Sequence, residues 1–399
     1  MRWLGFLAVI STHALRNVEV TFGREKYLVG VQPATTSRSS PPPLVLIPPV
    51  GVGIDRKFYD RLQVAWATIG APAAMHSIDL LGTGSATPKP RRFYSPEVWA
   101  DQLDAYICEE LKEPCVLVVQ GGLLPSALEV WRRSGSKAIA GISVLSPPPL
   151  RFFTKDANAD TASEGDAGMA SPAPVPRIRK RDRLRRALLF WRRDKQSDFS
   201  GSWNKPVSPA AVAPSRRTQR LVWAIACTPI GNLFFRRLRG GTPPGIRIRE
   251  FTERSLFANR ADVDDEWMAN CLAGAADSRG RFATFSYLAG SIPEGGAWRD
   301  ERGDVFDELD VPLQLLRGDF GGLENATERA EQLLQRAPRP ARGCSAVIKG
   351  ARACLPYEKP VATARMLARF VEAHFGGAAV PMSPAGKEEE DCCVVFEEQ

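Results

Sequence analysis

The sequence predicts an α/β fold with a mostly parallel central sheet, helices on both faces and a long helical insertion. Short, wholly apolar runs alternate with amphipathic segments, which is the rhythm of βαβ units. This rhythm stops near residue 150 and resumes near residue 308. The 399 residues are 44% apolar and 25% charged, which excludes collagen-like, fully disordered and membrane-embedded classes. No apolar run reaches the roughly 18 residues of a membrane-spanning helix.

The predicted elements follow from this pattern in chain order. Residues 18–31 alternate between polar and apolar and predict a two-stranded hairpin around Gly23. Parallel strands are predicted at residues 44–47, 73–78, 115–119, 139–145, 311–316 and 346–348. Helices are predicted at residues 58–66, 96–111, 125–131, 221–235, 263–288 and 361–375.

These elements divide the chain into a core and an insertion. The core is predicted at residues 15–150 and 308–380, with a helical lid at 151–307 between its two parts. Within the lid, residues 155–215 are rich in Ala, Asp, Ser, Gly and Pro and are predicted to be largely disordered.

Both ends of the chain carry separate predictions. Residues 1–14 combine an arginine, an apolar run and small residues, as a short signal peptide does. The start of a first strand and a truncated gene model are open alternatives. Residues 381–399 are predicted to form an acidic, disordered tail.

One basic segment, residues 177–195, accounts for the net charge of the chain. It carries ten Lys or Arg against two Asp, and the whole protein has a net charge of +8. As a helix, the segment would place Leu184, Leu188 and Trp191 on one face, a pattern that suits an anionic bilayer. The other interpretation is a solvated charge run inside a disordered insertion. Nucleic acid is not an expected partner, because a single aromatic among arginines is poor support for it.

Motifs along the chain resemble the α/β-hydrolase superfamily. They are LVLIPPVGVG at 44–53, DLLGTGS at 79–85, YSPEVWADQL at 94–103, the strand–elbow–helix segment at 115–130, IAGISVLSPP at 139–148, LLRGDFGG at 315–322 and IKGARACLPYEKP at 348–360. More narrowly, the chain resembles a plant, algal and cyanobacterial AB hydrolase-1-like branch whose members are often plastid-targeted. The resemblance implies an α/β-hydrolase fold with a lid after the fourth parallel strand, and a plastid location.

The same resemblance marks three positions where hydrolases of this fold carry a catalytic triad. The nucleophile position is Gly121, the acid position is Gly321 and the histidine position is Ala353. None of these residues can perform its role in nucleophilic catalysis. The sequence therefore predicts a degenerate triad.

Other residues could stand in for the missing groups. Ser126 lies on the helix after the elbow, Cys354 is next to the histidine position and Asp319 lies near the acid position. A thiol or hydroxyl needs a base to become a nucleophile. His76 is expected within a strand and His374 on the last helix, so neither is expected to serve as that base.

The oxyanion-binding groups of the fold are expected to survive. The backbone N–H groups of Val50 and Gly122 could bind a carbonyl or carboxylate oxygen. Gly51, Gln120 and Gly121 complete the expected ligand pocket. The alternative is that these donors only cap the elbow helix.

The sequence thus favours a non-catalytic binder of a small apolar carbonyl or ester compound, or a scaffold. The alternative is a noncanonical hydrolase or lyase acting on a lipid-like or pigment-like ester. No metal site and no cofactor are predicted, because cysteine spacings and glycine motifs match no known ligand set or fingerprint.

Overall fold

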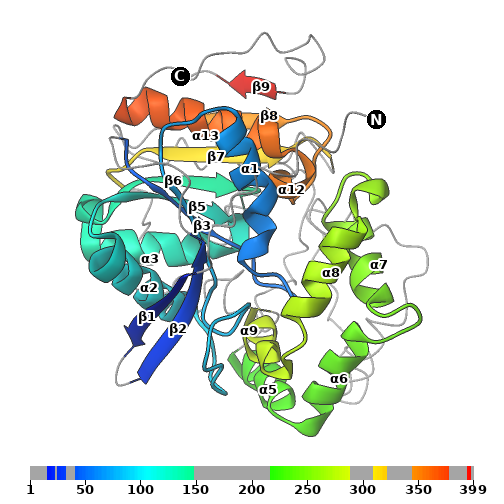
Figure 1. Ribbon diagram of the computed structural model, residues 1–399. Helices are drawn as coiled ribbons and strands as arrows, with labels where there is room; N and C mark the ends of the chain where they lie inside the picture. The colour runs from blue at the N-terminus through cyan, green and yellow to red at the C-terminus, as the bar shows by residue number, and fades with distance from the viewer. Residues whose placement is uncertain are drawn as a thin grey trace, which may run out of the picture.

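A single sheet organises the computed structural model of the chain. The structure describes residues 16–22, 25–32, 41–147, 216–287, 309–320, 344–376 and 393–396. The nine strands of the sheet lie in the order β1-β2-β4-β3-β5-β6-β7-β8-β9, with helices on both faces (Figure 1). Residues 1–14 and 155–215, including the basic segment 177–195, lie outside the described residues.

The predicted parallel strands are confirmed. They are β3 (Leu44–Ile47), β4 (Met75–Ile78), β5 (Cys115–Gln120), β6 (Ile139–Leu145), β7 (Leu313–Gly318) and β8 (Ser345–Ile348). Each neighbouring pair from β4 to β8 runs parallel. Strands β6 and β7 flank the long insertion in the sequence yet pair directly, with Ile142 opposite Leu313. The insertion therefore leaves the sheet and returns without interrupting it.

Antiparallel strands complete both edges. The predicted hairpin is present as β1 (Arg16–Phe22) and β2 (Glu25–Gln32), and β2 also pairs antiparallel with β4. At the other edge, β9 (Cys393–Phe396) pairs antiparallel with β8. This corrects the expectation of a disordered tail for these four residues. Their run of Cys, Val, Val and Phe favours a strand, and the open edge of β8 supplies the backbone partners.

Helices cover the two faces of the sheet in pairs. Helices α2 (Pro96–Ala105) and α3 (Leu124–Ser134) lie on one face, and α1 (Asp60–Thr68) and α13 (Pro360–Phe375) on the other (Figure 1). Alternate residues of each buried strand face opposite layers. In β3, for example, Val45 packs in the α2–α3 core and Leu46 packs in the α1–α13 core.

The insertion contributes five described helices, where the sequence predicted two long ones. They are α5 (Arg216–Ala226), α6 (Pro229–Arg239), α7 (Ile246–Ser255), α8 (Asp265–Gly274) and α9 (Arg281–Ser286). The predicted helix at 221–235 breaks because Thr228 caps α6 by accepting a hydrogen bond from Gly231 N–H, and Pro229 follows. The prediction also missed α7, whose ten residues follow the glycine- and proline-rich stretch 240–245.

A buried ion pair fixes the loops at the carboxyl ends of the strands. Asp79, at the end of β4, is fully buried, and its carboxylate accepts hydrogen bonds from the backbone N–H of Arg56 at 2.9 Å and from its guanidinium at 2.8 Å. The backbone N–H and hydroxyl of Ser85 donate to the same carboxylate at 2.8 and 2.6 Å. The N–H of Asp79 itself donates to Gly30 of β2. One side chain therefore joins three segments of the chain.

The lid packs on the loop after β3 through backbone atoms. Gly53 has φ +77°, and a Cβ there would overlap the carbonyl oxygen of Cys271 in α8. A Cβ on Gly274 would in turn overlap the carbonyl of Gly53. Farther along, the hydroxyl of Thr284 in α9 donates to the carbonyl of Gly51 at 3.2 Å. The described helices α8 and α9 of the insertion therefore lie against the loop at the carboxyl end of β3.

Replacing Gly53 by Ala tests this contact. The new methyl group must displace α8 and also adopt a left-handed backbone, so we expect a loss of roughly 3 kcal/mol in the free energy of unfolding. Gly70→Ala is the matched control, because Gly70 has φ +66° with nothing within 4 Å of the added Cβ. It should cost only about 1 kcal/mol. Equal losses in urea unfolding would contradict the contact between α8 and the loop.

Candidate functional site

The turn after β5 occupies the place of a nucleophile elbow. Strand β5 ends at Gln120, a 3₁₀ turn spans Gly121–Leu123, and α3 begins at Leu124. A nucleophile elbow is a sharp, strained turn that lifts its nucleophile above the sheet. Gly121 is not among the described glycines with positive φ. The turn therefore joins strand to helix without the left-handed backbone that only glycine readily adopts.

The carbonyl oxygen of Ala353 is the polar centre of the site. The side-chain amide of Gln120 donates to it at 2.7 Å, and the hydroxyl of Ser146 donates to it at 3.1 Å. Ser146 directly follows β6 in a left-handed conformation with φ +54°, and its N–H donates to the carbonyl of Leu316 in β7 at 2.6 Å. We call Gln120, Ser146 and the Ala353 carbonyl the carbonyl clamp. It ties the loop after β8 to the ends of β5 and β6.

Gln120 also carries an unused acceptor. Its Oε1 atom is buried and has no hydrogen-bond partner among the described residues. A buried amide oxygen without a partner costs free energy, so this atom is available to a group that donates a hydrogen bond.

Glu358 holds the loop that carries Ala353. One carboxylate oxygen accepts the N–H of Ala258 at 2.6 Å, and the other accepts the N–H groups of Arg352 and Cys354 at 3.0 and 3.2 Å. Burial raises the pKa of Glu358, and these three donors oppose that rise. Because Ala258 belongs to the insertion, Glu358 binds the lid to the loop after β8.

Cys354 is buried beside this carboxylate. Burial and the negative charge of Glu358 raise the pKa of its thiol well above the ordinary value. The guanidinium of Arg352 does not lower this pKa; it donates to the carbonyl of Arg254 and lies over the ring of Phe320. The protonated thiol is therefore a poor nucleophile.

The other two stand-in residues occupy structural positions. Ser126 is fully buried in α3, and its hydroxyl has no hydrogen-bond partner among the described residues. Asp319 accepts the N–H of Gly350 at 2.6 Å and so closes the turn after β8. Gly321, the expected acid position, lies outside the described residues.

The two described histidines lie elsewhere. His76 is in β4, its ring nitrogen is 3.0 Å from the hydroxyl of Tyr106, and burial lowers its pKa. His374 is on α13 and its ring contacts Phe370 and Phe375. In the described part of the chain, no histidine is hydrogen-bonded to Ser126, Cys354 or Asp319.

A lid tyrosine lies against Gly122, one of the two predicted oxyanion groups. A Cβ on Gly122 would lie 2.9 Å from the hydroxyl of Tyr287, at the end of α9. Burial raises the pKa of Tyr287, so its phenol stays protonated and can donate a hydrogen bond. Val50 is buried on the opposite loop, and Gly51 beside it is held by Thr284. Nothing in the sequence singles out Tyr287, because only the packing of the lid brings it to Gly122.

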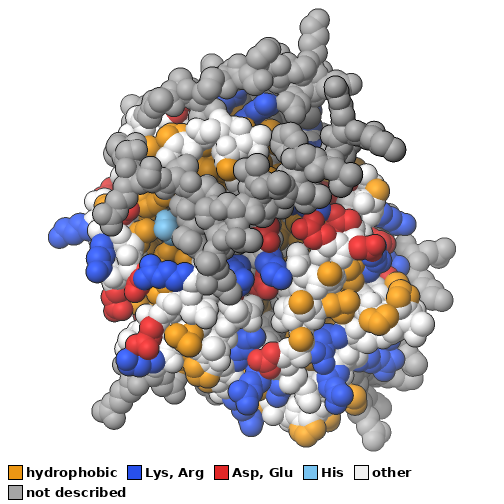
Figure 2. Space-filling model, viewed as in Figure 1, with side chains coloured by type: hydrophobic (Ala, Val, Ile, Leu, Met, Phe, Trp, Pro, Cys, Tyr) orange, Lys and Arg blue, Asp and Glu red, His pale blue; other side chains and the backbone are white. Residues whose placement is uncertain are grey.

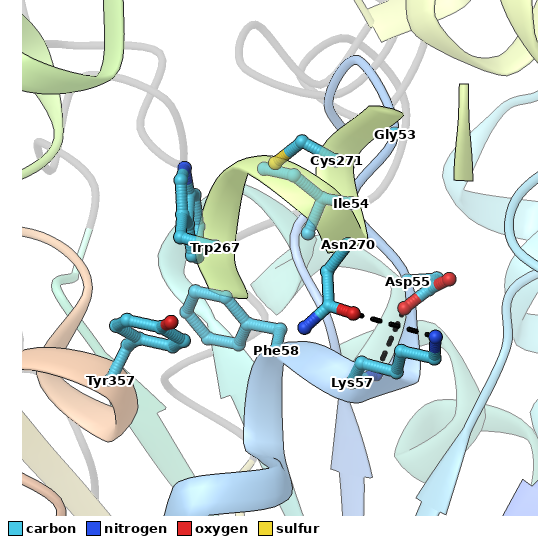
Figure 3. A pocket seen from close by; sticks show the side chains of 9 residues that line it. All are labelled: Gly53, Ile54, Asp55, Lys57, Phe58, Trp267, Asn270, Cys271 and Tyr357. Carbon is cyan, nitrogen blue, oxygen red and sulfur yellow. Dashed lines mark hydrogen bonds between the residues drawn. The ribbon is translucent and has the colours of Figure 1, made fainter. Parts of the chain in front are cut away.

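A shallow hollow lies where the loop after β3 meets α8 (Figure 3). Phe58, Trp267 and Tyr357 form its aromatic side, and the ammonium group of Lys57 reaches Asn270 at 3.4 Å. Its lining residues include none of those predicted for the site. Among the described residues, no cluster of His, Cys, Asp and Glu could hold a metal ion, and no helix is long and apolar enough to cross a membrane.

Comparison with known proteins identifies the fold. No family model matches the sequence, and no curated protein matches it. The structure is similar to an esterase from Thermogutta terrifontis, with 15% identity, a TM-score of 0.54 and coverage of 90% of this chain and 99% of that one. It is also similar to the Cif epoxide hydrolase from Acinetobacter nosocomialis, with 13% identity, a TM-score of 0.57 and coverage of 89% and 88%.

A third similar structure is a loop variant of the haloalkane dehalogenase DbeA from Bradyrhizobium elkanii. It has 16% identity and a TM-score of 0.53, and the match covers 93% of this chain and 99% of that one. The chain therefore has the α/β-hydrolase fold, as the motifs predict. At such low identity the likeness shows the fold alone.

The carbonyl clamp predicts a non-additive pair of substitutions. Gln120→Leu and Ser146→Ala should each cost about 1 kcal/mol, because the other donor still satisfies the carbonyl of Ala353. The double variant leaves that carbonyl without either donor and should cost more than the sum, by roughly 1 kcal/mol. Urea unfolding of the four proteins in this cycle measures the coupling. Strict additivity would show that the two donors act independently.

Asp60 predicts a pH dependence of stability. It is the first residue of α1, its Oδ1 atom is buried without a partner among the described residues, and burial raises its pKa to about 6. Between about pH 4 and pH 6 the unfolded chain loses this proton while the folded protein keeps it, so stability falls as pH rises.

Asp60→Asn removes this titration. The variant should match the wild type near pH 4 and be more stable by roughly 1–2 kcal/mol near pH 8, after allowance for partial solvent screening. The check is urea unfolding of both proteins at the two pH values. A stability difference that does not change with pH would contradict the raised pKa.

Proposed function

We propose that this protein, which has the α/β-hydrolase fold, binds a small apolar carbonyl or ester compound without hydrolysing it. The observation that carries the proposal is the carbonyl clamp. At the histidine position the chain offers a backbone carbonyl, and Gln120 and Ser146 already bind it. Gly121 has no side chain to act as a nucleophile, which further supports a degenerate triad.

Groups around the turn after β5 suit a ligand with one polar end. The N–H groups of Val50 and Gly122 and the phenol of Tyr287 are candidate donors to a carbonyl oxygen. The unpartnered Oε1 of Gln120 is a candidate acceptor for a hydroxyl or amide beside that carbonyl. A scaffold role, in which no small molecule binds, is the other non-catalytic form of the proposal.

The second candidate function is a noncanonical hydrolase or lyase for a lipid-like or pigment-like ester. The likeness to an esterase, an epoxide hydrolase and a dehalogenase favours it. Two observations oppose it. The pKa of the Cys354 thiol is raised, and Ser126 is buried without a base beside it. A plastid location and contact of the segment 177–195 with an anionic membrane also remain proposals, the first from the sequence resemblance and the second from the charge pattern.

A reactive probe separates the two functions. We expect no labelling of the purified protein by a fluorophosphonate, because the described residues offer no activated serine. Intact-mass spectrometry measures the label, and the Ser126→Ala and Cys354→Ala variants are controls. Stoichiometric labelling that either variant abolishes would establish the enzyme instead.

An ester that reports its own hydrolysis tests binding. With p-nitrophenyl butyrate we expect a rise in Tm without release of nitrophenolate above the buffer rate. At a concentration of about 100 times Kd, such binding adds about 2.7 kcal/mol to the free energy of unfolding. Gln120→Leu should reduce the rise in Tm. Release of nitrophenolate by the wild type would support the hydrolase. An unchanged Tm across a panel of esters and ketones would contradict ligand binding and favour the scaffold role.

A further inference from the structure

The outer face of the lid exposes large apolar side chains. Leu221 and Ile225 of α5 are 52% and 44% exposed, and Ile230 and Leu233 of α6 are 69% and 67% exposed. Their spacings of four and three residues place each pair on one side of its helix. We call these four residues the lid face. Side chains of this size in open solvent, close together on two adjacent helices, mark a surface that contacts something.

Helices α5 and α6 present this face as a rigid hairpin. Gly231 is buried at the start of α6, and a Cβ there would crowd the backbone of Ile225 and Ala226. Phe235 is buried on the inner side of α6, where it packs with Ala226 and Phe285. The exposed residues are therefore outward-facing parts of an anchored element.

Every charged residue of α5 and α6 is an arginine. Residues 216–239 contain six arginines and no aspartate or glutamate. Arg236 and Arg237 are exposed on α6, three and four residues after Leu233. Figure 2 shows hydrophobic side chains and Lys or Arg side chains next to each other over the lid helices.

We propose that the lid face docks on an anionic lipid surface. Arginine guanidinium groups pair with lipid phosphates, and the protruding leucines and isoleucines enter the boundary between headgroups and acyl chains. A second copy of the chain fits less well, because a symmetric dimer would bring two arginine-rich faces together. The proposal needs only the four residues of the lid face with Arg236 and Arg237, so it does not require a contribution from the segment 177–195, and it does not rest on the proposed function.

Vesicle co-sedimentation of the full-length protein tests the docking surface. We expect binding to phosphatidylcholine vesicles that contain phosphatidylglycerol, weaker binding in high salt, and little binding to phosphatidylcholine alone. Leu233→Asp and Ile230→Asp should each weaken binding by about tenfold, the effect of about 1.4 kcal/mol. Arg236→Gln with Arg237→Gln should reduce the dependence on salt.

Val64→Asp is the matched control. Val64 is 57% exposed on α1, outside the lid, so this change adds the same charge at similar exposure. Circular dichroism melting shows whether each variant is folded. The proposal is overturned if Leu233→Asp binds like the wild type, if Val64→Asp loses as much binding as the lid variants, or if anionic vesicles do not bind at all. A dimer that Leu233→Asp dissociates, with no change in vesicle binding, would identify a second copy as the occupant.

Discussion

The carboxylate of Asp79 holds the functional edge of this molecule together. It is buried at the end of β4 and receives four hydrogen bonds from Arg56 and Ser85. Removing one partner from a buried ion pair typically costs about 3–5 kcal/mol, since the remaining charge is left without compensation. The loop that carries Val50, Gly51 and Gly53 precedes Arg56 directly. Its position, and therefore the position of the lid that rests on it, depends on this one side chain.

The lid belongs to the core rather than lying on it. Phe282 and Ala283 of α9 join the apolar cluster around α2 and α3, while Trp267 and Met268 of α8 join the cluster around α1 and α13. Each apolar layer of the sheet thus continues into the insertion. Polar contacts strengthen the same connection, since Tyr357 and Arg61 both bind Asp264 at the start of α8. The described helices of the insertion and the sheet share one hydrophobic core.

The sequence was enough to locate the parallel strands, because a strand buried on both faces is apolar at every position, as Leu44–Ile47 is. It was not enough to place β9, whose pairing depends on the free edge of β8, or to separate the helices of the lid. Motif resemblance drew attention to Gly121 and Ala353, whose assignment as triad positions stays a prediction. The sequence did not predict the hydrogen bond between Ser146 and Ala353, because these residues are 207 positions apart and meet only in the folded chain. The position of Tyr287 beside Gly122 was not predicted for the same reason.

The contact between Gly53 and α8 has a kinetic consequence. Two backbones that touch directly offer no side chain that could rotate aside, so α8 separates from this loop only by moving as a unit. Motions of this kind take microseconds to seconds, far longer than a rotamer change. A molecule held behind the lid could leave no faster than the lid opens. The protein would then set a shortest residence time that chemically different ligands share.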